Sequence, residues 1–150
     1  MENYIYYDDI ILDNSIIDYV WQIYHSSLPM VLSGKNFPSF KLYELPNALS
    51  KYLISMIHTI DTSVKFAAIQ SVTGAQDIHI DNGRTLVYNY VLDSGGENSI
   101  TCWYDKTSDV EFNIIDSVKL MPRRWHKLNV LNYHRVNNLT STRVAITVFR

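Results

Sequence analysis

A single cysteine, Cys102, stands among the 150 residues, so the chain cannot form an internal disulfide. It lies in an apolar run, where a lone thiol is typically a buried structural residue of a protein from a reducing compartment. Long apolar runs are also missing, and none approaches the roughly 20 residues that a membrane-spanning helix needs. Residues 1–4 lack the basic start and the apolar stretch of a signal peptide. These absences predict a cytoplasmic protein with no membrane as partner.

The chain also lacks a large excess of either positive or negative charge. The formal net charge is -2, from 13 lysines and arginines against 15 aspartates and glutamates. Nucleic-acid binding usually needs a basic surface, so this balance argues against a nucleic acid as partner. The basic residues within 123–127 are more typical of a solvated loop than of a phosphate contact. With 47% hydrophobic residues, the chain is long enough for one folded domain with a sizeable core.

Two kinds of periodicity divide the chain. Up to about residue 60 many apolar residues recur at helical spacing, and Asp13 and Pro46 stand where helices begin. After residue 62 the apolar residues occur in short runs typical of strands, separated by turn signals such as Asn82-Gly83. The predicted elements are a strand over 4–12, a helix over 15–26, a loop over 27–44 with a short strand, a helix from 46 to 59, and strands near 64–72, 77–81, 85–92, 99–104, 110–119, 127–133 and 142–149. We therefore expect one domain, with helical support over about 13–60 and an antiparallel β-sandwich or barrel over about 64–149.

His79 and Asp81 form half of a candidate metal site. Side chains alternate along an extended backbone, so these two point to one face while Ile80 points to the other. A neutral imidazole and a carboxylate on one face are two of the three ligands of a facial, iron-type site. The third ligand is available in His134, at the end of a strand-like run.

Arg143 opens the last predicted strand, nine residues after His134. Alternation places Arg143, Ala145 and Thr147 on one face and a purely apolar set on the other. The side chains beside Arg143 on the first face are small or polar, as expected for the lining of a cavity. An arginine that faces inward is costly unless it meets an anion, and its planar fork pairs well with a carboxylate. The sequence thus predicts a carboxylate receptor beside the metal site.

Residues 64–149 resemble the Fe(II)/2-oxoglutarate-dependent dioxygenases. The resemblance lies in the order of the motifs: a His-x-Asp triplet, a histidine about fifty residues later, and an arginine nine residues after that histidine. The segment from His79 to Leu92, the turn Gly95-Gly96-Glu97 and the closing segment from His134 to Val148 look like motifs of the prolyl-hydroxylase-like branch. The resemblance implies a double-stranded β-helix, which is a jelly-roll, with two helices packed on one sheet. A chain this short is similar to minimal bacterial and viral versions of that fold.

The resemblance also implies a reaction. His79, Asp81 and His134 would bind Fe(II), and Arg143 would hold the distal carboxylate of 2-oxoglutarate. The enzyme would then use O2 to hydroxylate a C–H bond and would release succinate and CO2, with ascorbate as an optional reductant. No catalytic residue beyond the metal ligands is implied. The implied substrate is a peptide, with a prolyl residue as first choice, or an amino acid or another small molecule.

Further residues are candidates for contact with the cosubstrate and the substrate. The matched strand turns Asn89 and Val91 inward, which leaves the site without the tyrosine that is usual in this branch. Gln70 is a candidate for that helper role. Arg84 and Trp103 are candidates for substrate contact, although a tryptophan in a strand is more typical of the core. The expected cosubstrate contacts are Arg143, Thr147, Asn89 and Gln70.

Several alternatives stay open on the sequence alone. His126 and Asp77 are alternative metal ligands, of which His126 is disfavoured because Arg135 after it opens no strand with a small, polar face. A non-catalytic cupin-like module, in which a metal only holds the fold, would use the same ligands. So would a metal-dependent isomerase or hydrolase. Arg143 favours the dioxygenase, because a structural metal gives no reason for a buried arginine.

Overall fold

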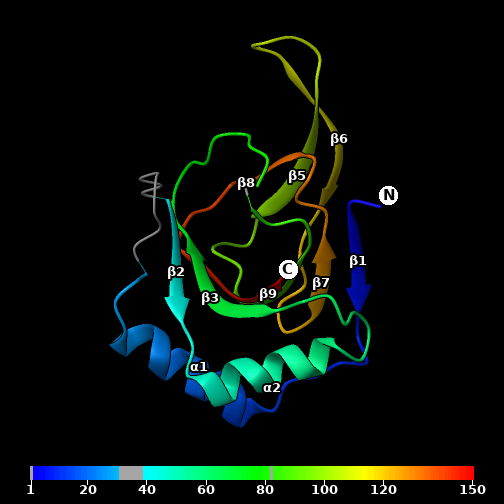
Figure 1. Ribbon diagram of the computed structural model, residues 1–150. Coiled ribbons are helices and arrows are strands. Elements are labelled where there is room, and N and C mark those ends of the chain that lie inside the picture. Colours follow the sequence, from blue (N-terminus) through cyan, green and yellow to red (C-terminus); the bar gives the residue numbers. More distant parts are fainter. Residues whose placement is uncertain (1, 31–38, 82) are drawn as a thin grey trace.

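The computed structural model describes residues 2–30, 39–81 and 83–150, and within them the chain forms two helices and nine strands (Figure 1). In chain order these are β1 (Tyr4–Tyr7), α1 (Asn14–Ser26), β2 (Phe40–Glu44), α2 (Asn47–Ile57), β3 (Phe66–Val72), β4 (Val87–Asp93), β5 (Ile100–Lys106), β6 (Phe112–Val118), β7 (Trp125–Leu128), β8 (Tyr133–Asn137) and β9 (Arg143–Phe149). Residues 31–38 of the predicted loop and Asn82 of the predicted turn lie outside the described residues. None of the helices in the described ranges has the length and apolar character needed to cross a membrane.

The strands form two antiparallel sheets. The larger sheet has the order β1-β7-β4-β9-β3-β2, and the smaller sheet has the order β6-β5-β8. A single backbone bridge between His79 and His134 attaches the segment before β4 to β8. In Figure 1 the two helices lie along one side of the larger sheet, and β5, β6 and β8 lie on its other side. The protein is therefore mainly β, with antiparallel sheets and two helices, as the change of periodicity predicts.

Both faces of the larger sheet are buried, and β9 connects the two cores. On the helix side, the apolar face of β9 packs with the buried stripes of α1 and α2; the members are Ile17, Val20, Leu49, Leu53, Ile57, Val144, Ile146 and Val148. On the other side, Ala145 of β9 and Val91 of β4 pack with Trp103 of the smaller sheet. The predicted alternation along β9 and the inward orientation of Val91 are therefore confirmed, and Cys102 is buried as expected.

The predicted strand over 127–133 is wrong. Two short strands, β7 and β8, replace it, and they belong to different sheets. The side-chain oxygen of Asn129 accepts a hydrogen bond of 3.0 Å from the backbone N–H of Leu131, which helps to turn the chain between the two strands. His134 consequently lies near the start of β8 and not at the end of a strand.

Two other strands are shorter than predicted because their partners end. The segment 77–81 pairs with β8 only at His79: on one side β8 begins at Tyr133, and on the other the backbone N–H of Val136 donates to the side-chain oxygen of Gln76 at 3.2 Å. The first strand stops at Tyr7, opposite the first residue of β7. Within the basic cluster, His126 lies inside β7 and is only 2% exposed, so the interpretation of 123–127 as a solvated loop is wrong for this residue.

Candidate metal centre and anion site

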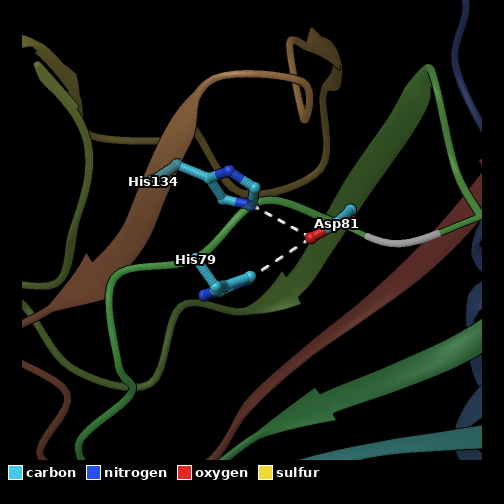
Figure 2. Close-up of side chains that lie close together, drawn as sticks. All are labelled: His79, Asp81 and His134. Carbon is cyan, nitrogen blue, oxygen red and sulfur yellow. Dashed lines mark ion pairs between the residues drawn. The ribbon is translucent and has the colours of Figure 1, made fainter. Parts of the chain in front are cut away.

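Three side chains converge at the edge of the smaller sheet. His134 comes from β8, and His79 and Asp81 come from the segment bridged to it (Figure 2). Nε2 of His79 lies 3.3 Å from Oδ1 of Asp81, and Nε2 of His134 lies 3.2 Å from the same oxygen. Backbone hydrogen bonds of 3.1 and 2.9 Å between His79 and His134 hold the two segments together. The three residues predicted as ligands, which we call the metal triad, are thus brought together, and the side chain of Asp77 is not part of this group.

Backbone carbonyls fix the tautomer of both histidines. Nδ1 of His79 lies 2.7 Å from the carbonyl oxygen of Asp77, and Nδ1 of His134 lies 2.8 Å from that of Asn132. A carbonyl oxygen only accepts, so each Nδ1 carries a proton and each neutral ring has its lone pair on Nε2. Metal-binding histidines are commonly oriented in this way. In the neutral rings two lone pairs and a carboxylate oxygen therefore meet at one point, and this arrangement is stabilised either by a cation or by a second proton on a ring, which Nε2 then donates to Asp81.

The charges around Asp81 keep it ionised. Burial alone would raise the pKa of its carboxyl, but hydrogen bonds from His134 and His79 and the charge of Arg84 hold that pKa well below its usual range. The hydrogen bond with Asp81 in turn raises the pKa of His79, against the opposing effect of burial. A proton on the histidine offsets the same negative charge that a divalent cation would, so metal binding here would release protons.

Arg84 binds the second oxygen of Asp81. Its Nη2 lies 2.6 Å from Oδ2, so Oδ1 alone faces the two histidines. Gly83, with a φ of 80°, makes the turn that brings Arg84 back to the carboxylate. Sequence reasoning placed Arg84 at the substrate and missed this pair. The signal was present, because a basic residue follows the ligand by three positions across a glycine.

The geometry suits one divalent transition-metal ion. Ligand atoms that share an ion at about 2.1 Å lie about 3.0–3.4 Å apart, and the distances of 3.2 and 3.3 Å in the metal triad fall in this range. Two imidazoles and one carboxylate oxygen on one side of an ion leave its other side open to further ligands. The same donor types, two histidines and one carboxylate, form the facial sites of non-haem Fe(II) oxygenases.

Arg143 is a buried cation with neutral partners. It is 3% exposed, and Nε donates to the carbonyl of Ser94 at 3.1 Å, Nη1 to the hydroxyl of Thr101 at 3.1 Å and Nη2 to the hydroxyl of Ser99 at 3.2 Å. Five N–H donors and three partners leave two donors for another group. Burial lowers the pKa of Arg143 to about 10, and no carboxylate of the described residues forms an ion pair with it. We call these four residues the anion site.

The anion site lies close to the metal triad along β5. Arg143 contacts Thr101, and His134 is paired with Trp103, two residues further along β5. Two residues of extended strand span about 7 Å. This spacing along β5, between the position that contacts Arg143 and the position paired with His134, is comparable to the length of a five-carbon dicarboxylate.

A row of buried polar side chains crosses the larger sheet on the face of Arg143. Asn89 of β4 stands directly opposite His126 of β7 and Thr147 of β9. Oδ1 of Asn89, Oγ1 of Thr147 and Nδ1 of His126 have no hydrogen-bond partner of ordinary geometry within the described residues. Each such buried atom costs about 1–3 kcal/mol unless a ligand or water pairs with it. This polar row is therefore suited to a polar ligand.

The remaining predicted residues divide between this face and the core. Gln70 is buried on the same face, opposite Ala145 of β9. Trp103 is fully buried, donates from its indole N–H to the carbonyl of Asn129 at 2.8 Å and stacks on Tyr4. These contacts favour the core interpretation of Trp103 over substrate contact. His126 was missed as a member of the polar row because the strand that carries it was placed too late in the sequence.

His126 should make the metal-free protein less stable in mild acid. Burial has the largest effect and lowers its pKa; the Arg124 carbonyl opposes this effect, and the charge of Arg143 lowers the pKa further. The unfolded chain then takes up a proton below about pH 6.5 that the folded chain resists, so stability is retained above that pH and lost as the pH falls, by up to about 1.4 kcal/mol per unit. Urea unfolding at pH 7.5 and 5.5 should show a larger loss for the wild type than for His126→Gln. Equal losses would contradict this assignment, and the opposing contribution of His79 cancels because both proteins contain it.

Comparison with known proteins adds no family at this point. The chain matches no protein-family model, and no curated protein is significantly similar to it.

Proposed function

We propose that the protein is an Fe(II)- and 2-oxoglutarate-dependent dioxygenase built on a double-stranded β-helix. The strand order supports this fold. From β3 onward the chain passes back and forth between the sheets, except that β5 and β6 follow one another in the smaller sheet. The strands β3, β4, β7 and β9 lie adjacent in the larger sheet, while the bridged segment at His79 and β5, β6 and β8 form the smaller side. In this description β1 and β2 extend the larger sheet at its two edges.

The observation that carries the proposal is the buried Arg143 beside the metal triad. A structural metal site requires only its ligands, and gives no reason for a cation that is 3% exposed with hydroxyl and carbonyl partners. An ionised group in such a position is costly unless it meets a countercharge. A dicarboxylate supplies that countercharge at one end and can reach the metal with the other. This favours the dioxygenase over a non-catalytic cupin-like module.

The proposed roles of the residues follow from their contacts. His79, Asp81 and His134 would hold Fe(II), which supplies the redox chemistry of O2 activation when bound. Arg143 would pair with the distal carboxylate of 2-oxoglutarate, helped by the hydroxyls of Ser99 and Thr101, which accept from Arg143 and keep their own protons to donate. Arg143 would in this way orient the cosubstrate toward the metal triad.

The polar row and the apolar residues around it would complete the cosubstrate site. Asn89, Thr147 and His126 offer hydrogen bonds on the same face as Arg143, and Gln70 lies on this face too. Val91 and Ala145, both fully buried, would shield the aliphatic part of the cosubstrate from water. The products would be succinate, CO2 and a hydroxylated substrate, with ascorbate as an optional reductant.

Succinate formation tests this proposal. The protein is incubated in air with Fe(II), 2-oxoglutarate and a panel of amino acids and proline-containing peptides, and succinate is measured. We expect release that is stimulated by at least one panel member and is absent in His134→Ala. Metal binding without any succinate, in the wild type and across the panel, would instead support the non-catalytic cupin-like module.

A further inference from the structure

Arg84 joins the metal triad to a second group of side chains. Its Nη2 is paired with Asp81, and its guanidinium carbon lies 5.4 Å from the ring centroids of both Phe40 and Phe149. Rings at this distance attract the cation and restrict its side chain to few orientations. Only 17% of the side-chain surface is exposed. The guanidinium is thus held in one place beside the metal triad.

One half of this guanidinium has no hydrogen-bond partner among the residues that the structure describes. Nη1 of Arg84 is buried, and no acceptor of the described residues forms a hydrogen bond with it. Pairing with Asp81 explains Nη2 but leaves Nη1 without a role. Buried N–H groups of charged side chains are almost always paired in folded proteins, often by a ligand. The unpaired Nη1 therefore marks a position for an acceptor next to the metal triad.

The charges favour an anionic acceptor. Fe(II) and the two arginines, Arg84 and Arg143, bring four positive charges, whereas Asp81 and the dicarboxylate bring three negative ones. Among the groups in direct contact with the ion or the cosubstrate, one positive charge is therefore left over. Arg143 already serves the cosubstrate, so Arg84 is the cation available to a further ligand. A carboxylate would satisfy Nη1 and neutralise the excess together.

We infer that Arg84 binds the carboxylate of the substrate, and that the substrate is a small carboxylic acid such as a free amino acid. This inference rests on the proposed function. It narrows the substrate from the peptides and small molecules that the sequence allows to molecules with a free carboxylate close to the C–H bond that reacts. An internal residue of a peptide has no such group.

Matched pairs of ligands test the inference. The protein is loaded with Mn²⁺, which amino acids bind weakly, and the relaxation of ligand protons by the ion is measured by NMR for free amino acids and for their carboxamides. We expect the best acid to bind at least about tenfold more tightly than its amide, which is the effect of one charge-assisted hydrogen bond. Arg84→Gln should bring this ratio close to one, and Arg84→Lys should keep part of it. Arg150→Gln, an exposed arginine that contacts Thr85 and Ser63, should leave the ratio unchanged.

The ratio of the affinities for acid and amide distinguishes substrate binding by Arg84 from a role in which Arg84 only supports Asp81. If Arg84 only orients Asp81, Arg84→Gln will weaken Mn²⁺ binding and leave the ratio of acid to amide as in the wild type. That result, or a wild type without any preference for acids, would overturn the inference. The measurements are made with and without 2-oxoglutarate. A failure of 2-oxoglutarate to bind would count against the proposed function and is detected separately from a loss of acid preference.

Discussion

The Arg143→Met variant should bind 2-oxoglutarate with an affinity at least about a hundredfold lower than that of the wild type, while Fe(II) binding and folding remain intact. The guanidinium is the only cation assigned to the distal carboxylate, and charge-assisted pairs of this kind contribute about 1.5–3 kcal/mol beyond the cost of leaving the partner unpaired. Isothermal titration of the Mn²⁺-loaded protein with 2-oxoglutarate measures the loss. Arg135→Met, which removes an arginine that bonds Tyr104 in the smaller sheet, is the matched control and should bind normally.

The same substitution should leave the ligand-free protein as stable as the wild type or more stable. Burial disfavours the charged form of Arg143, as its pKa of about 10 indicates, and only neutral oxygens compensate. An apolar side chain of similar size removes that cost, which offsets the loss of the three hydrogen bonds that Arg143 donates to Ser94, Thr101 and Ser99. Urea unfolding measures this. A large loss of stability together with normal 2-oxoglutarate binding would show that Arg143 serves the fold and not a cosubstrate.

His134→Ala should abolish metal binding without unfolding the chain. Removal of one of three ligands costs more than removal of a group that only orients a ligand, for which about 10–100-fold in affinity is usual. The side chain of His134 contributes Nε2 to the metal triad, and its backbone bridge to His79 does not depend on the imidazole. Equilibrium dialysis with Fe(II) under anaerobic conditions measures the effect.

His25→Ala provides the control for loss of a histidine. His25 lies in the last turn of α1, is exposed and stands far along the chain from the metal triad. It should bind Fe(II) as the wild type does. If His134→Ala retained Fe(II) with wild-type affinity, the metal triad would not be the binding site.

Local alternation explains which parts of the site could be predicted from the sequence. His79 and Asp81 are separated by one residue, and Arg143, Ala145 and Thr147 follow the period of a strand, so their shared faces depend on the backbone alone. That the faces of these residues meet was expected from the resemblance to the dioxygenases, on the order of His79, Asp81, His134 and Arg143 along the chain. These inferences needed no knowledge of strand boundaries.

The parts that could not be predicted depend on contacts between distant segments. The division of 127–133 into β7 and β8 involves a turn at Asn129 that contains neither glycine nor proline, and His126 entered the polar row only through the position of β7. The pairing of Arg84 with Asp81 is local and could have been predicted from the sequence, whereas the contacts of Arg84 with Phe40 and Phe149 join segments that are remote in sequence. Periodicity carries no information on such contacts.

The central claim is that the metal triad and Arg143 form one binding site. Its most direct test is anaerobic addition of Fe(II) and then 2-oxoglutarate, followed by visible absorption. We predict a metal-to-ligand charge-transfer band in the wild type that saturates with 2-oxoglutarate, is absent in His134→Ala and requires far more 2-oxoglutarate in Arg143→Met. No band in the wild type, together with no succinate when air is admitted, would contradict the claim.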